Sequence, residues 1–309
     1  MNPDNPSPLI DIAPELAAAL RNGQPTVALE STIIAQGMAY PENLATARAV
    51  EAIARAGGAI PATIAIIGGR AKVGLSAAEL EFIAGEPGIA KASSRDIPFL
   101  MATAGHGATT VAATIRIASL AGIRVMVTGG IGGVHRGAGQ SFDLSADLHE
   151  LARHGVAVVS AGAKSILDIG ATLEMLETLS VPVVVFGADR FPSFYSRDSG
   201  QQAPARLDNP RAIARMMRAK WRMVDEGGIL IANPIAADDE VPAAEIEQAI
   251  AAAEREMAAA GIAGKDATPF MLAKINELTA GRSLQANIAL IKSNARLGAA
   301  IAVAYATPD

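Results

Sequence analysis

The sequence predicts an α/β fold in which a mostly parallel central sheet is covered by helices on both faces (α/β/α) and followed by a C-terminal helical segment. Short apolar segments alternate with amphipathic segments of ten or more residues along much of the chain, as in βαβ units. Half of the 309 residues are hydrophobic and only 4% are aromatic, which is typical of closely packed layers of helices on a sheet. A chain of this length can bury a sizeable core.

Local signals define the elements of the first half of the chain. Residues 1–10 are rich in Pro and Asn and are expected to form a loose tail, followed by a single α/β/α domain over residues 11–309. The nearly continuous apolar segment at 61–67 is typical of a strand buried on both faces. Ser76 and Glu79 form a capping-box pattern, which predicts that a helix begins here. The other elements expected in this half are helices at 14–21, 41–56 and 109–121, a helix capped by Asp96, and strands at 27–30, 71–74 and 90–93.

The alternation of strands and helices continues in the second half. A long polar loop at 188–208 interrupts it, and loops of this length usually carry function. No shift in composition marks a domain boundary, and residues 236–242 are the best candidate for a linker. The expected strands are 125–127, 156–160, 182–186 and 228–232, and the expected helices are 145–154, 168–179, 209–225 and three more after Pro242.

Composition and charge exclude several functional classes. The formal net charge is −5, so a nucleic-acid polymer is not an expected partner and an anionic substrate must be held by local amides and a few cations. The chain has no cysteine, which excludes disulfides, thiolate zinc sites and cysteine nucleophiles. The N-terminus is acidic before its first cation, Arg21, unlike a signal peptide. Glycines interrupt the apolar segment at 97–115, so we expect a cytoplasmic protein without a membrane span.

The stretch at 125–170 contains the densest set of candidate functional residues. An apolar strand ends at Val127 in a turn rich in glycine, but no frame of this turn gives the G-x-G-x-x-G spacing of a dinucleotide site. The segment before Lys164 also lacks the glycine that a P-loop requires. The backbone amides of 129–133, with His135 and Arg136 nearby, are suited to bind a phosphate. The alternative is a tight turn whose glycines are needed for positive φ angles.

An acidic cluster follows the glycine turn. Asp143, Ser145 and Asp147 are spaced like the first ligands of a calcium loop, but Leu148 and His154 stand where that loop requires Gly and Glu. Two interpretations remain open. One is a divalent cation held by a single carboxylate and water molecules. The other, which the spacing alone favours, is a helix start with Asp143 or Ser145 as its N-cap.

Two further side chains are candidates for acid–base or covalent chemistry. Lys164 follows a buried strand and is flanked by small and apolar residues, which would partly desolvate its amine and make it nucleophilic toward a carbonyl group. The alternative is a surface lysine that pairs with Asp168, one helical turn further on. Glu30 ends the first buried strand and is a candidate general acid or base. The alternative is a carboxylate that accepts hydrogen bonds from loop or helix amides.

Long segments of the chain together resemble the pseudouridine-5'-phosphate glycosidase family. The resemblance covers residues from about 12 to the C-terminus. It implies cleavage of pseudouridine 5'-phosphate to uracil and ribose 5-phosphate by a homotrimeric α/β/α enzyme that uses a divalent ion such as Mn2+. The segments are ALESTII at 28–34, PATIAIIGG at 61–69, GATTV at 107–111, TGGIGGVHRG at 128–137, FDLSADL at 142–148, AGAKSIL at 161–167 and SLQANI at 283–288.

The resemblance also implies roles for individual residues. It places the Schiff-base lysine at Lys164, the proton-donating glutamate at Glu30 and the metal ligand at Asp143. Together with the glycine turn, it predicts that substrate contacts involve Lys91, Val111, Thr128, Gly129, Gly130, His135, Ser145, Ala146, Asp147 and Asn287. The chain departs from the family pattern at Gln36, Ala39, Ala92 and Ser94, beside Glu30 and Lys91, which puts local hydrogen bonding and phosphate affinity in question.

Two other functions share parts of this residue set. A lysine Schiff-base aldolase or isomerase of sugar phosphates needs Lys164 and a phosphate site but no place for uracil. A non-catalytic nucleotide-binding protein would hold pseudouridine 5'-phosphate without changing it. The release of uracil distinguishes the glycosidase from both.

Overall fold

The computed structural model describes residues 9–224, 226–262, 264 and 267–307. The predicted loose tail therefore falls mostly outside the described part of the chain, as does the predicted helix end at Asp225. The last residue of that tail, Ile10, lies instead in a short strand, because it pairs with Ala71 and is buried.

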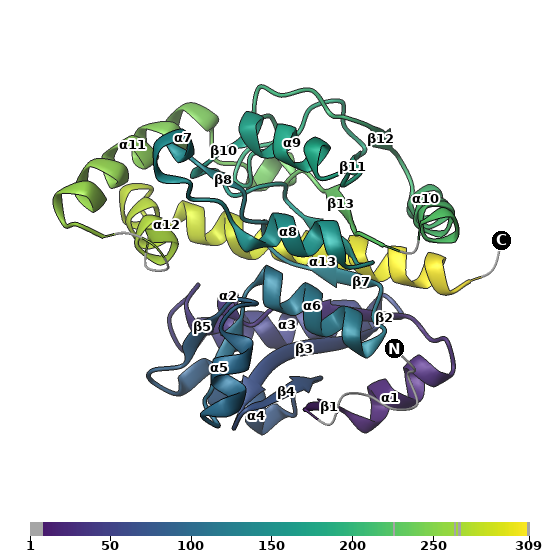
Figure 1. Ribbon diagram of the computed structural model, residues 1–309. Helices are drawn as coiled ribbons and strands as arrows, with labels where there is room; N and C mark the ends of the chain where they lie inside the picture. The colour runs from purple at the N-terminus through teal and green to yellow at the C-terminus, as the bar shows by residue number, and fades with distance from the viewer. Residues whose placement is uncertain (1–8, 225, 263, 265–266, 308–309) are drawn as a thin grey trace.

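A mostly parallel sheet of eleven strands forms the centre of the molecule (Figure 1). Within the described residues, the antiparallel pairs of this sheet join β3 to β4 and to β6, and the predicted fold class is confirmed. Four central strands, β2, β7, β9 and β13, are buried along their whole length, as expected for strands covered on both faces. The order along the sheet is β1 (Ile10–Ile12), β4 (Arg70–Val73), β3 (Ile60–Ile67), β2 (Thr26–Leu29), β7 (Val125–Val127), β9 (Ala157–Ser160), β13 (Ile229–Ala232), β11 (Val183–Phe186) and β12 (Arg206–Leu207), with β5 (Ala90–Ala92) paired to β6 (Gly107–Thr109) beside β3.

Helices cover both faces of the sheet. The long helices are α1 (Pro14–Arg21), α3 (Glu42–Ala56), α4 (Ala77–Gly85), α6 (Val111–Ala121), α8 (Ala146–Arg153), α9 (Ile169–Thr178), α10 (Pro210–Met223), α11 (Ala243–Ala259), α12 (Ala267–Leu278) and α13 (Arg282–Ala306). Helix α13 packs against β2, β7 and β9 and against α3 and α10. In front of the sheet, α6 packs against α8, which contacts α9 (Figure 1). The three helices predicted after Pro242 are confirmed as α11, α12 and α13.

Helix α13 is long and apolar enough to span a membrane by length and composition alone. In the structure it crosses the middle of the molecule (Figure 1), and half of its apolar 18-residue stretch is buried. It approaches the sheet closely, because a Cβ atom added at Gly298 would lie 2.2 Å from Cγ2 of Val127. We therefore describe α13 as the central core helix.

Several short elements were not predicted. Helix α6 begins after Thr110, its N-cap, because Thr109 belongs to the buried strand β6, so the predicted helix start at 109 is wrong. Asp96 stands at the N-cap of α5 (Ile97–Ala102), but its carboxylate accepts from the Ser93 N–H at 2.8 Å rather than from the helix. The other unpredicted elements are β1, α2 (Thr32–Ala35), β8 (Val134–His135), α7 (Ala138–Ser141), β10 (Leu167–Asp168), β12 within the predicted long loop and a 3-10 helix, η1 (Ala237–Asp239), within the proposed linker.

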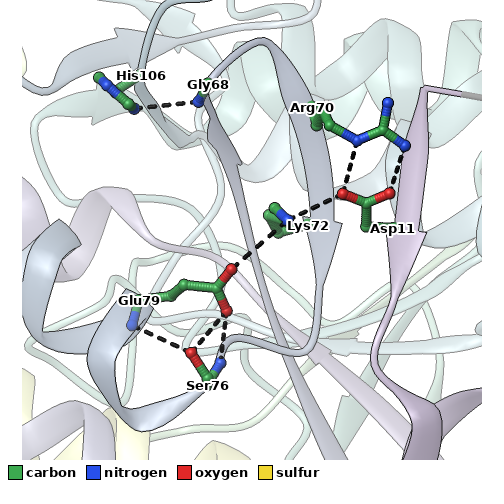
Figure 2. A network of polar contacts seen from close by, with 7 residues as sticks. All are labelled: Asp11, Gly68, Arg70, Lys72, Ser76, Glu79 and His106. Atoms are coloured by element: carbon green, nitrogen blue, oxygen red, sulfur yellow. Dashed lines mark hydrogen bonds and ion pairs between the residues drawn. The ribbon is translucent and has the colours of Figure 1, made fainter.

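A network of charged side chains fixes the edge of the sheet (Figure 2). Asp11 on β1 accepts a hydrogen bond from Arg70 Nε at 2.7 Å, and Lys72 Nζ lies 2.9 Å from the same carboxylate. Lys72 also lies 3.6 Å from Glu79, which forms the predicted capping box with Ser76 at the start of α4. The network therefore joins β1, β4 and α4.

Candidate functional site

The predicted site residues gather at the carboxyl ends of the parallel strands. Glu30 directly follows β2, Thr128 follows β7, and Lys164 lies shortly after β9. Ligand sites of α/β sheets lie at this edge, because residues from several parallel strands meet there. A cavity of about 950 Å³ opens at this position. Its lining includes Glu30, Lys91, Val111, His135, Asp143, Ser145, Ala146, Asp147 and Lys164.

A smaller cavity of about 60 Å³ adjoins the larger one. The two share a boundary, because Glu30, Lys91 and Lys164 line both. Asn287 from α13 lines the smaller cavity, is only 7% exposed, and its Oδ1 has no hydrogen-bond partner among the described residues. A buried amide oxygen without a partner is costly, so this atom is available to a ligand. The other predicted residues in this wall are Gly129 and Gly130.

Glu30 is held by two hydroxyl groups. The residue is 8% exposed, and its carboxylate accepts short hydrogen bonds from Oγ1 of Thr32 and from Oγ1 of Thr128. Hydroxyl groups, rather than the amides of the alternative interpretation, therefore orient this carboxylate. Thr128 is fully buried and is not among the residues that line either cavity. The structure thus places Thr128 behind Glu30 rather than at the predicted contact with substrate.

Lys164 is half-buried and lies where the two cavities meet. Its backbone N–H donates to the carbonyl oxygen of Ile131 at 3.0 Å, and the N–H of Ile131 donates to the carbonyl oxygen of Gly162 at 3.1 Å. These bonds join the lysine segment to the glycine turn. The position of the amine is therefore set by two loops that follow neighbouring strands, β7 and β9.

The surface alternative for Lys164 is not observed. Asp168 is the N-cap of α9, and its Oδ1 accepts a hydrogen bond from the N–H of Ala171 at 2.9 Å. Within the described part of the chain, no ion pair joins Lys164 to Asp168. The lysine contributes to the cavity instead.

The glycine turn is shaped by close packing. None of the four glycines within 129–133 has a positive φ angle, so the alternative based on positive φ is wrong for them. A Cβ atom at Gly130 would lie 2.5 Å from the ring of Phe194, and one at Gly132 would lie 2.3 Å from Oγ of Ser145. Side chains from other elements therefore occupy the space that a larger residue would need.

Two amides of this turn are already engaged inside the protein. The N–H of Ile131 donates to Gly162, and the N–H of Gly132 donates to Oδ2 of Asp147 at 2.7 Å. The prediction that successive amides of the turn converge on a phosphate is therefore wrong for these two. Lys91, which lines both cavities, is a predicted side-chain cation for a phosphate.

Asp147 connects the glycine turn to helix α6. It is 6% exposed, and besides the bond from Gly132 its Oδ1 accepts from the N–H of Ala112 at 2.8 Å. Both carboxylate oxygens thus fix backbone around the cavity, including the neighbouring Val111. Ser145 accepts from the N–H of Asp147 at 3.2 Å and is the N-cap of α8. Of the two predicted caps, Ser145 is confirmed.

Asp143 is left facing the larger cavity, with its side chain 47% exposed and 3.9 Å from Nδ1 of His135. Burial lowers the pKa of His135, Asp143 opposes this effect, and the positive charges of Lys164 and Lys91 add to it. The imidazole is therefore neutral near pH 7, the form that binds metals. Among the described residues, no cluster of three or more acidic or histidine side chains could enclose a metal. One carboxylate and one imidazole, completed by water and substrate oxygens, fit a divalent ion such as Mn2+.

Several residues of the site were not predicted. Thr32 could have been found from its position two residues after Glu30, and Phe194 lies in the long loop for which we expected a function. Thr268 of α12 lines both cavities, and no local sequence signal marks it. Among the departures from the family pattern, Gln36 and Ser94 reach the cavities, and Nε2 of Gln36 donates to the carbonyl oxygen of Ile89 at 3.0 Å.

The chain is similar over nearly its whole length to known enzymes. The model of the family described as indigoidine synthase A-like protein matches residues 15–304. A pseudouridine-5'-phosphate glycosidase of Nocardioides sp. is 60% identical over 301 residues, which cover 97% of this chain and 98% of the relative. Another, of Deinococcus radiodurans, is 58% identical over 297 residues, which cover 96% of this chain and 95% of the relative.

Two solved structures share the fold. The prealnumycin C-glycosynthase AlnA, in complex with ribulose 5-phosphate, has a TM-score of 0.90 and 38% identity, covering 97% of this chain and 98% of that one. An indigoidine synthase A-like protein of Thermotoga maritima has a TM-score of 0.88 and 38% identity, covering 97% of both chains. The chain belongs to the family of pseudouridine-5'-phosphate glycosidases, the indigoidine synthase A-like proteins.

Proposed function

We propose that this chain cleaves the carbon–carbon glycosidic bond of pseudouridine 5'-phosphate, reversibly, to uracil and ribose 5-phosphate. Its relatives are named for this substrate. The observation that carries the proposal is the placement of Lys164, Glu30 and Lys91 at the junction of the two cavities. These residues supply a nucleophilic amine, a carboxyl group and a cation for the phosphate.

The reaction needs an amine because the bond to be broken joins two carbon atoms. An ordinary glycosidase protonates a leaving oxygen, whereas the bonded carbon of uracil has no lone pair to protonate. Lys164 adds to C1' of the ring-opened ribose, and its nitrogen lone pair forms a Schiff base as the bond to uracil breaks. Water then hydrolyses the Schiff base, which releases ribose 5-phosphate and restores the amine.

Glu30 carries the proton transfers of this scheme. The ring oxygen of the ribose must gain a proton when the ring opens, and the uracil carbon must gain one when its bond to C1' breaks. Glu30 lines both cavities and is oriented by Thr32 and Thr128, so it is suited to act as general acid and base. The unpartnered Oδ1 of Asn287 in the smaller cavity supports binding of a uracil N–H there.

The proposal includes a metal ion and an assembly that the family resemblance implies. Asp143 would hold one Mn2+ ion per subunit, with His135 beside it. Bound there, the ion would supply positive charge that helps to orient the oxygens of the substrate. The enzyme is proposed to be a cytoplasmic homotrimer that acts on small molecules, with no nucleic-acid polymer or membrane as partner.

Release of uracil from pseudouridine 5'-phosphate tests the proposed function. The protein is incubated with this substrate and Mn2+, and uracil is followed by its ultraviolet spectrum. We expect Lys164→Ala to reduce the rate by at least about a thousandfold, because the covalent route is removed, and the matched variant Lys292→Ala, outside both cavities, to remain active. Borohydride is expected to trap a ribose 5-phosphate adduct on Lys164, detected by mass spectrometry.

Several outcomes would contradict the proposal. Full turnover by Lys164→Ala, or no adduct on Lys164, rules out the covalent mechanism. Binding of the nucleotide without release of uracil indicates a non-catalytic nucleotide-binding protein. A Schiff base with other sugar phosphates in the absence of uracil release indicates an aldolase or isomerase.

A further inference from the structure

A chain of buried polar contacts ends on the carboxylate of Glu30. It begins at Asn233, just after β13, passes through Asn294 on the core helix α13, and reaches Glu30 through Thr128. Asn294 is fully buried, and Asn233 is 7% exposed. Neither lines the two cavities, so both act on the site only through other residues. We call Asn233, Asn294 and Thr128 the relay.

The backbone of Thr128 is held on both sides. Its N–H donates to the carbonyl oxygen of Val159 on β9 at 3.0 Å. Its own carbonyl oxygen accepts from Nδ2 of Asn294 at 2.8 Å, and the same Nδ2 lies 3.3 Å from the carbonyl oxygen of Gly129. The peptide between Thr128 and Gly129 is thus fixed by α13, and this sets the direction of the Thr128 hydroxyl that donates to Glu30.

Asn233 determines which end of the Asn294 amide faces Thr128. Nδ2 of Asn233 donates to Oδ1 of Asn294 at 2.9 Å, and the N–H of Asn233 donates to the carbonyl oxygen of Ser160 at 2.7 Å. Oδ1 of Asn294 is therefore the acceptor on one side, and its NH2 group is the donor on the other. Buried amides are held in one orientation when all their partners are present.

We propose that the relay positions Glu30 for proton transfer to uracil, with Asn294 and Asn233 as positioning residues. The inference rests on the proposed function of Glu30 as proton donor. When the Asn294 amide is lost, the carbonyl oxygen of Thr128 loses its donor from α13. The direction of the Thr128 hydroxyl is then less well defined, and among the described residues the other hydroxyl donor to Glu30 is Thr32. Formation of the Schiff base between Lys164 and free ribose 5-phosphate needs no protonation of uracil, and this free sugar opens its ring in water without a catalyst. The extent of trapping at equilibrium therefore does not depend on the relay.

A pair of substitutions at Thr128 separates the hydroxyl from the methyl group. Thr128→Val keeps the shape and removes the donor, and it is expected to lower the kcat for uracil release by about 10- to 100-fold, a fraction of what general acid catalysis supplies. Thr128→Ser keeps the donor and is expected to retain most of the rate. A packing role predicts the reverse order. The matched control is Thr63→Val, because Thr63 on β3 donates to Oε1 of another glutamate, Glu51, at 2.5 Å.

Asn294→Leu tests the part of the relay that lies outside the cavities. It is expected to lower kcat to a similar extent as Thr128→Val, while borohydride still traps ribose 5-phosphate on Lys164 to the wild-type extent. Thermal melting records the loss of stability in each variant, and Thr63→Val is expected to lose stability without losing kcat. If Asn294→Leu does not fold, the Thr128 pair and Asn233→Ala decide the question.

The outcomes distinguish this inference from the proposed function. A wild-type protein that releases no uracil contradicts the proposed function itself. An active wild type whose Thr128→Val variant keeps its kcat, or whose Thr128→Ser variant is as slow as Thr128→Val, contradicts the relay. Equal loss of uracil release and of Schiff-base trapping indicates general collapse of the site, which also overturns the proposal.

Discussion

Two hydroxyl groups orient the carboxylate of Glu30, and this arrangement suits its proposed role in proton transfer. Hydroxyl groups of Thr32 and Thr128 hold it, and no ion pair within the described residues joins it to Lys164. A close ion pair between the two would favour their charged forms, which would weaken both the amine as a nucleophile and the carboxyl group as a proton donor. The two groups share a cavity wall without forming such a pair.

At Asp143 we predict that substitution weakens metal binding. Asp143→Asn removes the charge of the carboxylate that faces the cavity, so the concentration of Mn2+ needed for half-maximal activity is expected to rise by at least about tenfold. Direct Mn2+ binding, measured by electron paramagnetic resonance of the free ion, is expected to weaken in parallel. The control is Asp208→Asn, since Asp208 pairs with Arg206 at 2.7 Å away from the cavity. Unchanged Mn2+ affinity in Asp143→Asn would remove Asp143 from the metal site.

At the scale of elements, a partly buried ion pair joins α8 to α6 at the wall of the larger cavity. Nη2 of Arg116 lies 2.8 Å and Nε 3.1 Å from the two oxygens of Glu150, whose side chain is 4% exposed. His154 Nε2 lies 2.9 Å from the same carboxylate. Burial alone raises the pKa of Glu150, but the contacts from His154 and Arg116 prevail and lower it to about 2. The pair thus ties the helix that follows the Asp143 cluster to the one that starts at Val111.

This pKa predicts how the stability contributed by Glu150 depends on pH. The folded pKa is below the ordinary value of 4.5, so the contribution is present above about pH 4.5 and is lost as the pH falls toward 2. Its upper limit is about 3 kcal/mol. Glu150→Gln is expected to lower the free energy of unfolding by about 1–3 kcal/mol at pH 7, measured by urea titration. The difference between wild type and variant should then shrink below pH 4.5.

An exposed residue provides the control for this measurement. Glu177→Gln on α9 changes the same charge at an exposed position and is expected to have little effect at any pH. A difference between wild type and Glu150→Gln that stayed constant from pH 7 to pH 3 would show that the ionised carboxylate does not stabilise α8.

At the scale of the whole molecule, the core helix α13 connects distant parts of the fold. It packs on β2, β7 and β9, carries Asn287 into the smaller cavity, and holds the Thr128 peptide through Asn294. Near its C-terminal end, Tyr305 packs edge-on against Trp221 of α10, with ring centroids 5.6 Å apart. One helix therefore supports both the candidate site and the packing of α10.

We predict that residues 11–309 unfold as a single domain. The continuous sheet and α13 leave no described segment that packs independently, so the transitions in urea followed by fluorescence of Trp221, the one tryptophan of the chain, by far-ultraviolet circular dichroism and by uracil release should coincide. Two separate transitions would show that the chain contains two folding units.

The sequence predicted the long elements well because their signals are local. Apolar runs such as 61–67, the capping box at Ser76 and the alternation of strands with helices each depend on neighbouring residues, and the structure agrees with them. Some short elements, such as β6, were missed because they depend on pairing with distant strands rather than on their own residues. The glycines of 129–133 suggested a site for a phosphate. The structure shows instead that side chains from elsewhere in the chain, such as Phe194, leave no room for a Cβ atom at Gly130 and Gly132.

By itself, the sequence determined the fold class and the family, because periodic patterns and motifs depend on the order of the residues. Most of the residues that it predicted for the site line the two cavities, with Thr128 as the exception. It left open whether Asp143 caps a helix, whether Lys164 pairs with Asp168, and what holds Glu30. Only the tertiary structure decided these points, since each depends on atoms that folding brings together. Ser145 is the N-cap of α8, and Asp168 is the N-cap of α9. Thr32 and Thr128 donate to Glu30, and Asn294 of α13 holds the carbonyl oxygen of Thr128. Hydrogen bonds between residues that are 98 and 166 positions apart produce no local sequence pattern from which they could be predicted.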